Sequence, residues 1–354
     1  MLNNKSRISI NLAHVKKNFQ YLRTRVGDAV EIAPAVKANA YGIGALEVVA
    51  SLRDYTSIFY VATIKEGAEL KEQFSNLDFI VLAGAATLEE AAIAKRLGLI
   101  LVVNSPLQLE LMARAKISSI FVNYDTGMGR LGFSQVEFAQ ADFSNFEVKY
   151  LLSHLANSDD SNSPVNHEQL QLLLAGHKKI PNAKLSLSNS GGIMLGAEFH
   201  LDQVRPGAAL YGVNSSCFNE LPLAVVVTIY ARVLQIRKLD RAQGIGYNGT
   251  YIGSKDQIIL TIEGGYADGI HRSLSNRGLA CFEGVQLPYI GRISMDCSTL
   301  DASGLSPEQL SRLNYVEILG ENININEIAS KGGTIGYEIL TSLKCSRFER
   351  VYIK

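Results

Sequence analysis

The sequence predicts an α/β fold in which an N-terminal (β/α)8 barrel, of the TIM-barrel type, is followed by a mostly antiparallel β-domain. Short β-branched apolar runs alternate with longer helical patterns from residue 31 to about residue 212, which is typical of repeated βα units around a parallel sheet. There are eight such runs, and eight strands close this type of barrel. After Tyr211 the pattern changes to β-rich stretches punctuated by glycine, which indicates a separate domain.

Each of the eight runs is short and apolar, as expected of a strand that is buried on both faces. They cover residues 31–36, 57–62, 79–83, 99–103, 119–123, 148–152, 184–187 and 201–204. Four following segments begin with a capping-box pattern, a hydroxyl residue three positions before Glu or Gln. The pairs are Thr63 with Glu66, Thr87 with Glu90, Ser105 with Gln108 and Ser134 with Glu137. Pro106 and Pro164 stand just inside helix starts, where a missing N–H is harmless.

We expect three parts of the chain. Residues 1–10 form an N-terminal strand that joins the C-terminal domain, residues 11–222 form the barrel, and residues 223–354 form the β-domain. Within the β-domain, residues 223–239 form a long strand. One helical pattern, at residues 337–343, precedes a last strand near Val351.

Composition favours a small-molecule partner. The 34 Lys and Arg residues balance the 34 Asp and Glu residues, so no field of one sign would attract nucleic acid or an anionic membrane. No apolar run approaches the ~20 residues that span a bilayer, and residues 1–17 lack the apolar core of a signal peptide, so we expect a cytoplasmic protein. The four cysteines have no zinc-site spacing, and we expect them to be reduced and buried, with no metal bound; they are Cys217, Cys281, Cys297 and Cys345.

The active site of such a barrel lies at the C-terminal ends of its strands. Lys37 follows the first strand. Partial burial at this position lowers the pKa of an amine from ~10.4. We therefore expect Lys37 to form a Schiff base with an aldehyde. Taken alone, a lysine at a strand end is more often an ordinary lysine paired with a carboxylate. Residues 190–192 and 207–208 follow strands seven and eight, whose loops often bind phosphate through backbone N–H groups, although two tight turns are the alternative. A phosphate cradle facing a lysine matches the needs of pyridoxal phosphate.

Arg205 follows the eighth strand and could face the pyridine nitrogen of that cofactor. Because a guanidinium stays protonated, it would keep the nitrogen unprotonated and weaken the electron sink. A less stabilised carbanion is reprotonated sooner at the α-carbon, which favours racemisation over transamination. A structural ion pair is the alternative role of this arginine.

Several segments resemble the signature segments of the alanine racemase family, a group of fold-type III pyridoxal-phosphate enzymes. They occur in family order and cover nearly the whole chain. They are residues 36–42 (Val-Lys-Ala-Asn-Ala-Tyr-Gly), 125–133, 205–207, 265–269, 292–296, 336–340 and 350–352.

The resemblance implies a head-to-tail homodimer whose active sites take residues from both subunits and which interconverts L-alanine and D-alanine, supplying D-alanine for peptidoglycan. Two proton-transfer groups are implied, Lys37, which also carries the cofactor, and Tyr247 of the partner subunit. The implied cofactor-binding residues are Lys37, Tyr41, His154, Asn189, Ser190, Arg205, Gly207 and Tyr337. The implied substrate-binding residues are Arg130 and Met295, and those at the entrance are Tyr266 and Asp296.

Three positions depart from the family pattern. Ile43 and Ser186 stand where histidine is frequent, and we expect neither to lie among the core chemical groups. Asn123 stands where many members carry a lysine that becomes carbamylated and steadies the active-site arginine. Arg130 is therefore expected to be held by the Asn123 amide or by a bound anion such as chloride.

Three other functions were weighed. A broad-spectrum or serine racemase of the same family is the closest alternative, because Asn123 puts the substrate range in question. A decarboxylase of the same barrel type is disfavoured, since those enzymes generally lack the pattern at residues 205–207. A non-catalytic pyridoxal-phosphate carrier would have a single domain, whereas this chain has a second domain that contains Tyr247.

Overall fold

The protein is described by a computed structural model that covers residues 5–216, 221–343 and 347–354. Its described residues form two compact units. Of the described residues, the barrel unit comprises 15–210, 214–216 and 221–223, and the β-unit comprises 5–14, 211–213, 224–343 and 347–354. We describe each unit by itself.

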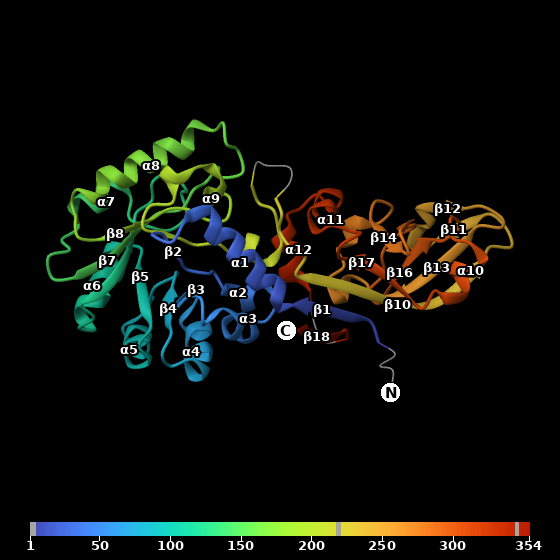
Figure 1. The fold of residues 1–354 in the computed structure, drawn as a ribbon, viewed down its shortest axis with the longest axis horizontal. Helices are drawn as coiled ribbons and strands as arrows, with labels where there is room; N and C mark the ends of the chain where they lie inside the picture. The colour runs from blue at the N-terminus through green and yellow to red at the C-terminus, as the bar shows by residue number, and fades with distance from the viewer. Residues whose placement is uncertain (1–4, 217–220, 344–346) are drawn as a thin grey trace. The chain divides into compact units, whose positions relative to one another are not determined.

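The barrel unit is built around a parallel sheet of eight strands (Figure 1). In chain order the strands are β2 (Glu31–Ile32), β3 (Ile58–Val61), β4 (Asp78–Val81), β5 (Ile100–Val103), β6 (Ser119–Asn123), β7 (Glu147–Leu152), β8 (Lys184–Ser186) and β9 (Gln203–Val204). Neighbouring strands pair in the order β2-β9-β8-β7-β6-β5-β4-β3. A parallel bridge between Ala35 and Tyr60 joins the two ends of this order. The predicted eight-stranded barrel is therefore confirmed, and each strand overlaps its predicted run.

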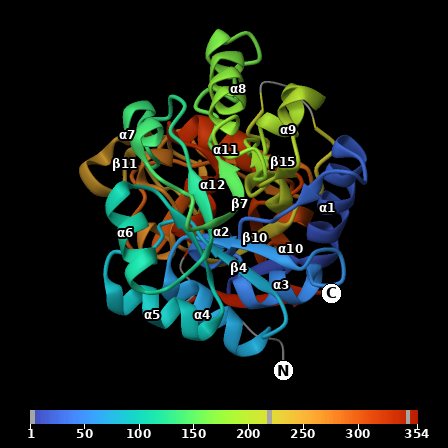
Figure 2. The ribbon, with the colours of Figure 1, turned by 90° about the vertical axis from the view of Figure 1, so that its left-hand side faces the viewer.

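Helices form the outer layer around these strands (Figure 2). They are α1 (Leu12–Val26), α3 (Ala45–Leu52), α4 (Ile64–Gln73), α5 (Leu88–Leu97), α6 (Pro106–Arg114), α7 (Gln135–Gln140), α8 (Pro164–His177) and the short α9 (Gly192–Leu195), with the turn α2 (Lys37–Tyr41) after β2. The predicted N-caps are present, because each of the four hydroxyls accepts from the N–H three residues later.

Only two of the four predicted capping boxes are complete, those of Thr63 with Glu66 and of Ser134 with Glu137. The side chains of Glu90 and Gln108 instead accept from the N–H of Ala86 and of Asn104, at 2.7 and 2.8 Å. The prediction was wrong for these two helices because the Glu90 and Gln108 side chains reach the residue before the N-cap. The four-residue pattern does not specify which of the two N–H groups is bound.

The β-unit contains a second, mostly antiparallel sheet. Its strands are β1 (Arg7–Asn11), β10 (Val227–Lys238), β13 (Ile258–Glu263), β14 (Leu279–Phe282), β15 (Val285–Pro288), β16 (Cys297–Asp301), β17 (Tyr315–Leu319) and β18 (Glu349–Ile353). The first strand, β1, pairs with β10 in antiparallel and with β18 in parallel orientation. The hairpin of β11 (Gln243–Ile245) and β12 (Tyr251–Gly253) is separate from this sheet. The predicted fold class is confirmed.

The β-unit has two helices that were not predicted, α10 (Pro307–Arg312) and α11 (Ile325–Gly332), besides the predicted one, α12 (Gly336–Ser342). Cys281 is buried and Cys297 is partly buried, and both are free thiols. Cys217 and Cys345 lie outside the described residues. Within the described part of the chain, no helix combines the length and the apolar character that crossing a membrane requires.

Candidate active site

Lys37 is followed by a left-handed turn of four non-glycine residues. Ala38, Asn39, Ala40 and Tyr41 have φ angles of 52°, 55°, 51° and 57°. This conformation costs an L-residue roughly 1–2 kcal/mol because the Cβ approaches the following carbonyl oxygen. The turn persists because neighbouring groups hold it, among them Asn39, whose Oδ1 accepts from the Ala45 N–H at 2.8 Å. Such strain gathers where a side chain must be aimed, and here it fixes the chain directly after Lys37.

The amine of Lys37 is half-buried and makes no hydrogen bond with any other described residue. Burial lowers its pKa from the ordinary value, because a charged ammonium loses its hydration. The positive charges of Arg130 and Arg205 lower it further, and Glu66 opposes them. The result is an amine with nucleophilic character that has no competing partner.

Arg205 is buried and is held by acceptors from two neighbouring strand ends. Its guanidinium donates to the Ser186 hydroxyl and to the Ser153 carbonyl, and its carbon lies 5.8 Å from the centre of the Tyr60 ring. Ser186 is thus a direct partner of Arg205, a supporting contact that was not predicted. A serine hydroxyl has no recognisable sequence pattern, so the contact follows only from the pairing of β8 with β9, which brings Ser186 beside Arg205.

His154 follows β7 and is a neutral imidazole in this environment. Burial lowers its pKa to about 3, and the positive charges of Arg205, Arg130 and Lys37 act in the same direction. Its Nε2 lies 3.4 Å from the Nδ2 of Asn189. These electrostatic couplings place Lys37, Arg130, His154 and Arg205 near one another in the barrel unit.

Ser190 organises a cradle of backbone N–H groups between the loops after β8 and β9. Its hydroxyl accepts from the N–H groups of Gly207 and Ala209, at 3.0 and 3.1 Å. The buried N–H groups of Ser190, Gly191 and Ala208 donate to none of the described residues. Buried N–H groups without a partner are rare in proteins.

Gly207 lets the Tyr41 phenol approach this cradle. A Cβ at position 207 would lie against the Tyr41 hydroxyl and 2.7 Å from its ring carbon Cζ. The unpartnered amides fit a phosphate group, because oriented N–H groups stabilise an anion. The residues present therefore fit a phosphorylated aldehyde cofactor whose aldehyde meets Lys37.

Arg130 is exposed and has no hydrogen bond or ion pair with the described residues. Its loop is shaped by Asp125, whose Oδ1 accepts from the N–H groups of Gly127 and Met128 at 3.0 and 2.8 Å. The Asn123 amide donates to Asn104 Oδ1 at 2.9 Å and does not bond to Arg130. The expectation that the Asn123 amide itself holds Arg130 was wrong, because a neighbouring amide takes that side chain.

The β-unit carries the remaining predicted residues on separate segments. Tyr247 is 67% exposed and lies in the single turn η3 (Tyr247–Gly249), and Tyr337 lies partly exposed in α12. Tyr266, Met295 and Asp296 lie on two loops that pack against each other and are all exposed.

Arg347 joins these two loops. It makes a bidentate ion pair with the buried Asp268, from Nε to Oδ1 at 2.7 Å and from Nη2 to Oδ2 at 2.9 Å, and Nη1 donates to Asp296. The Met295 carbonyl accepts from the Ala267 N–H at 3.1 Å, whereas the Met295 N–H donates to none of the described residues. That N–H is therefore free to bind an anionic group.

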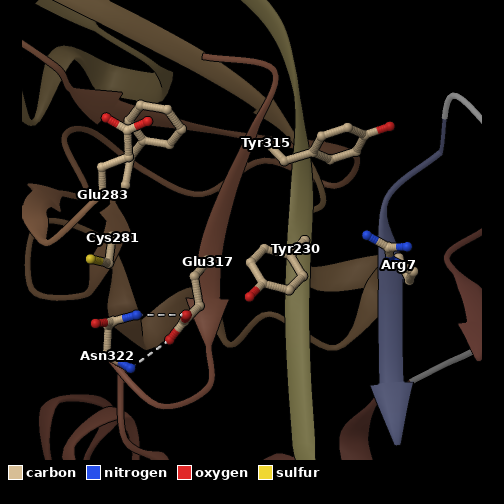
Figure 3. Close-up of a pocket in the computed structure, with 8 residues that line it drawn as sticks. Arg7, Tyr230, Cys281, Glu283, Tyr315, Glu317 and Asn322 are labelled. Atoms are coloured by element: carbon tan, nitrogen blue, oxygen red, sulfur yellow. Dashed lines mark hydrogen bonds between the residues drawn. The ribbon is translucent and has the colours of Figure 1, made fainter. Parts of the chain in front are cut away.

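A pocket of about 370 Å³ opens elsewhere in the β-unit (Figure 3). Its walls include Arg7, Tyr230 and Cys281, and the Glu317 carboxylate beside it is held by Asn322, whose N–H and Nδ2 donate at 2.7 and 2.9 Å. None of the predicted site residues lines this pocket.

Comparison with known proteins agrees with this arrangement. Residues 10–215 match the model of the alanine racemase N-terminal domain, and residues 226–352 match that of the alanine racemase C-terminal domain. This chain belongs to the alanine racemase family. The predicted family and the predicted two-domain fold class are thereby confirmed.

Named relatives within the alanine racemase family cover almost the whole chain. The catabolic alanine racemase of Mesorhizobium japonicum is 39% identical over 98% of this chain and 93% of its own length. The alanine racemase of Rickettsia akari is 36% identical over 98% of this chain and 99% of its own length.

Solved alanine racemase structures have the same fold. The structure from Bartonella henselae, which contains covalently bound pyridoxal phosphate, has a TM-score of 0.91 with 35% identity and covers 99% of both chains. The biosynthetic alanine racemase of Pseudomonas aeruginosa also has a TM-score of 0.91, with 30% identity over 99% of both chains.

Proposed function

We propose that this chain is a pyridoxal-phosphate-dependent racemase that interconverts L-alanine and D-alanine, with the cofactor held covalently by Lys37. The observation that carries the proposal is that the Lys37 amine and a cradle of buried N–H groups lie in the same unit and have no partner among the described residues. When bound, pyridoxal phosphate withdraws electrons from the α-carbon of an amino acid and so allows its α-proton to leave. The protein supplies binding, orientation and proton transfer.

The cofactor-binding residues divide by the group that each one binds. Ser190 and Gly207, with Tyr41, hold the phosphate through the cradle, and Tyr337 supplies a further hydroxyl to it. Arg205 binds the pyridine nitrogen, which stays unprotonated because the guanidinium keeps its own protons. His154 and Asn189 orient this end of the site, and a neutral His154 accepts a hydrogen bond without adding positive charge.

Racemisation requires proton transfer on opposite faces of a planar carbon, and one group cannot reach both faces. The Lys37 amine serves one face, and its lowered pKa increases the share of neutral amine that can accept a proton. The Tyr247 hydroxyl serves the other face. Because Tyr247 is 67% exposed on the β-unit, we assign it to the site of a second copy, in a homodimer whose sites take residues from both subunits.

The substrate carboxylate is bound by Arg130 and by the Met295 N–H, both of which have no partner among the described residues. Tyr266 and Asp296 line the entrance and set the size of the side chain that is admitted. Chloride beside Asn123 is the counter-ion that we assign to Arg130, because the amide of Asn123 is already bonded to Asn104. We place the enzyme in the cytoplasm, where it supplies D-alanine for peptidoglycan.

A broad-spectrum or serine racemase is the second candidate, and it is favoured by Arg130, which has no hydrogen bond or ion pair with the described residues. An arginine without a fixed partner can follow carboxylates of differently sized substrates. Turnover of alanine, serine, lysine and arginine by the same preparation decides between the two. A rate for alanine well above the others supports the first candidate, and comparable rates support the second.

The direct test is the optical rotation of L-alanine solutions in the presence of the protein and pyridoxal phosphate. We expect the rotation to decay to zero, and an unchanged rotation would rule out the proposal. Shared sites are tested by mixing two inactive variants, Lys37→Ala and Tyr247→Phe. Random subunit exchange should restore about a quarter of the wild-type activity, because half the dimers are mixed and each holds one intact site. No recovery after exchange would rule out sites shared between subunits.

A further inference from the structure

Glu66 connects the start of helix α4 to the turn that follows Lys37. Its Oε2 accepts from the N–H groups of Ala62 and Thr63, at 2.7 and 3.4 Å, in the manner of a capping box. Its other oxygen, Oε1, accepts from the N–H of Ala38 at 2.9 Å, across 28 positions of sequence. One carboxylate therefore holds two segments that belong to different βα units.

This second contact distinguishes Glu66 from the other capping carboxylates of the barrel unit. Glu90 accepts from the Ala86 N–H at 2.7 Å, and Glu137 accepts from the Ser134 N–H at 2.9 Å. Both of these bonds stay within the cap of the residue's own helix. The capping function therefore does not require the contact between Glu66 and Ala38.

The contact matters because Ala38 is the first residue of the left-handed turn. A strained turn persists only where surrounding groups over-determine it. The Ala38 N–H has no acceptor other than Glu66 among the described residues. Loss of the carboxylate leaves this donor without its protein acceptor and removes a restraint from the residue next to Lys37.

Among the described residues, Glu66 also supplies the one negative charge that acts on the Lys37 amine. The other charged or titratable groups coupled to that amine are Arg130, Arg205 and His154. The two arginines lower the pKa of Lys37, and Glu66 raises it. Removal of the Glu66 charge should therefore lower the pKa of Lys37 further.

We propose that Glu66 is a positioning residue for Lys37, whose carboxylate fixes the left-handed turn that aims the amine at the cofactor. This inference rests on the proposed role of Lys37 as the cofactor-binding lysine. Glu66 itself touches neither cofactor nor substrate in this account.

The test compares Glu66→Gln and Glu66→Ala with the matched control Glu90→Gln, which removes the charge of an equivalent cap. The first readout uses the apo-protein: competitive acetylation of Lys37, followed by mass spectrometry across a pH range. We expect the labelling midpoint to move to lower pH in both Glu66 variants and to stay at the wild-type position in Glu90→Gln.

The second readout is kcat/KM with alanine in the cofactor-loaded enzyme. We expect a loss of about tenfold in Glu66→Ala and a smaller loss in Glu66→Gln, because glutamine keeps one acceptor oxygen. Glu90→Gln should stay within about twofold of wild type. If Glu66→Ala does not fold, Glu66→Gln alone carries both readouts.

A Lys37 midpoint that is the same in Glu66→Gln and Glu90→Gln would overturn the inference, as would equal losses of kcat/KM in the two variants. Failure of the proposed function has a different signature. In that case the cofactor does not become attached to Lys37 in the wild-type protein, whatever the Glu66 variants do.

Discussion

The guanidinium of Arg205 donates to the hydroxyl of Ser186, and that hydroxyl in turn donates to the Gln203 carbonyl at 2.8 Å. Ser186 thus links the end of one barrel strand to the arginine that follows the next strand. The link matters for activity because Arg205 is buried. A buried guanidinium N–H group that lacks an acceptor carries a free-energy penalty.

Ser186→Ala should weaken the hold on Arg205. Loss of the acceptor costs roughly 1–3 kcal/mol, which corresponds to a fall of about tenfold or more in kcat/KM. Steady-state kinetics in both directions measures it. Ser51→Ala is the control, since Ser51 is also buried but bonds only to the Val48 carbonyl in α3. A Ser186→Ala enzyme as active as Ser51→Ala would show that Arg205 does not need this hydroxyl.

Gly207→Ala should reduce the affinity for pyridoxal phosphate about tenfold, because overpacking a tight site costs roughly 1–3 kcal/mol. The added Cβ would lie 2.7 Å from Cζ of Tyr41 and displace the phenol from the cradle. Titration of the apo-protein with the cofactor measures the change. Gly304→Ala, whose Cβ would meet only Val285 at 3.8 Å, is the control. Equal affinities of the two variants would contradict the placement of the phosphate.

The lowered pKa of His154 predicts a loss of stability in mild acid. Its pKa is about 3 in the folded protein and near 6.5 in an unfolded chain, so the unfolded chain binds the extra proton between these values. The contribution of His154 to the free energy of unfolding is full above pH 6.5 and falls as the pH drops toward 3. Urea unfolding of the apo-protein across this range should show a shallower fall in His154→Gln. The exposed His167→Gln should follow the wild type, and a His154→Gln curve parallel to the wild type would contradict the assignment.

Arg347→Met should raise the KM for alanine several-fold with a smaller effect on kcat. The substitution releases Asp268 and Asp296 and loosens the loop that presents the Met295 N–H. Arg312→Met is the matched control, because Arg312 forms an ion pair with Glu283 away from these loops. Initial rates against alanine concentration separate the two parameters. An unchanged KM in Arg347→Met would mean that the loops keep their geometry without the arginine.

Local patterns predicted the barrel well because its strands and caps are encoded over a few neighbouring residues. Each of the eight apolar runs corresponds to a strand, and the hydroxyl of every predicted N-cap makes its expected hydrogen bond. Helix α11 was not predicted, because it begins inside the alternating stretch at residues 322–326, whose period of two is that of a strand.

The supporting contacts of the candidate site could not be predicted from the sequence. Ser186 meets Arg205 across 19 positions, and Glu66 meets Ala38 across 28. Both contacts depend on which strands become neighbours when the barrel closes. Lys37, Arg205 and the residues around Ser190 were predicted because strand ends and glycine-rich loops can be located without knowing those pairings.

The proposed function depends on a covalent link between the Lys37 amine and pyridoxal phosphate. Borohydride reduction of the cofactor-loaded protein, followed by proteolysis and mass spectrometry, detects this link. We expect one phosphopyridoxyl group per chain, on the peptide that contains Lys37, and none after Lys37→Ala. A stable label on another lysine, with Lys37 unmodified, would show that Lys37 does not carry the cofactor.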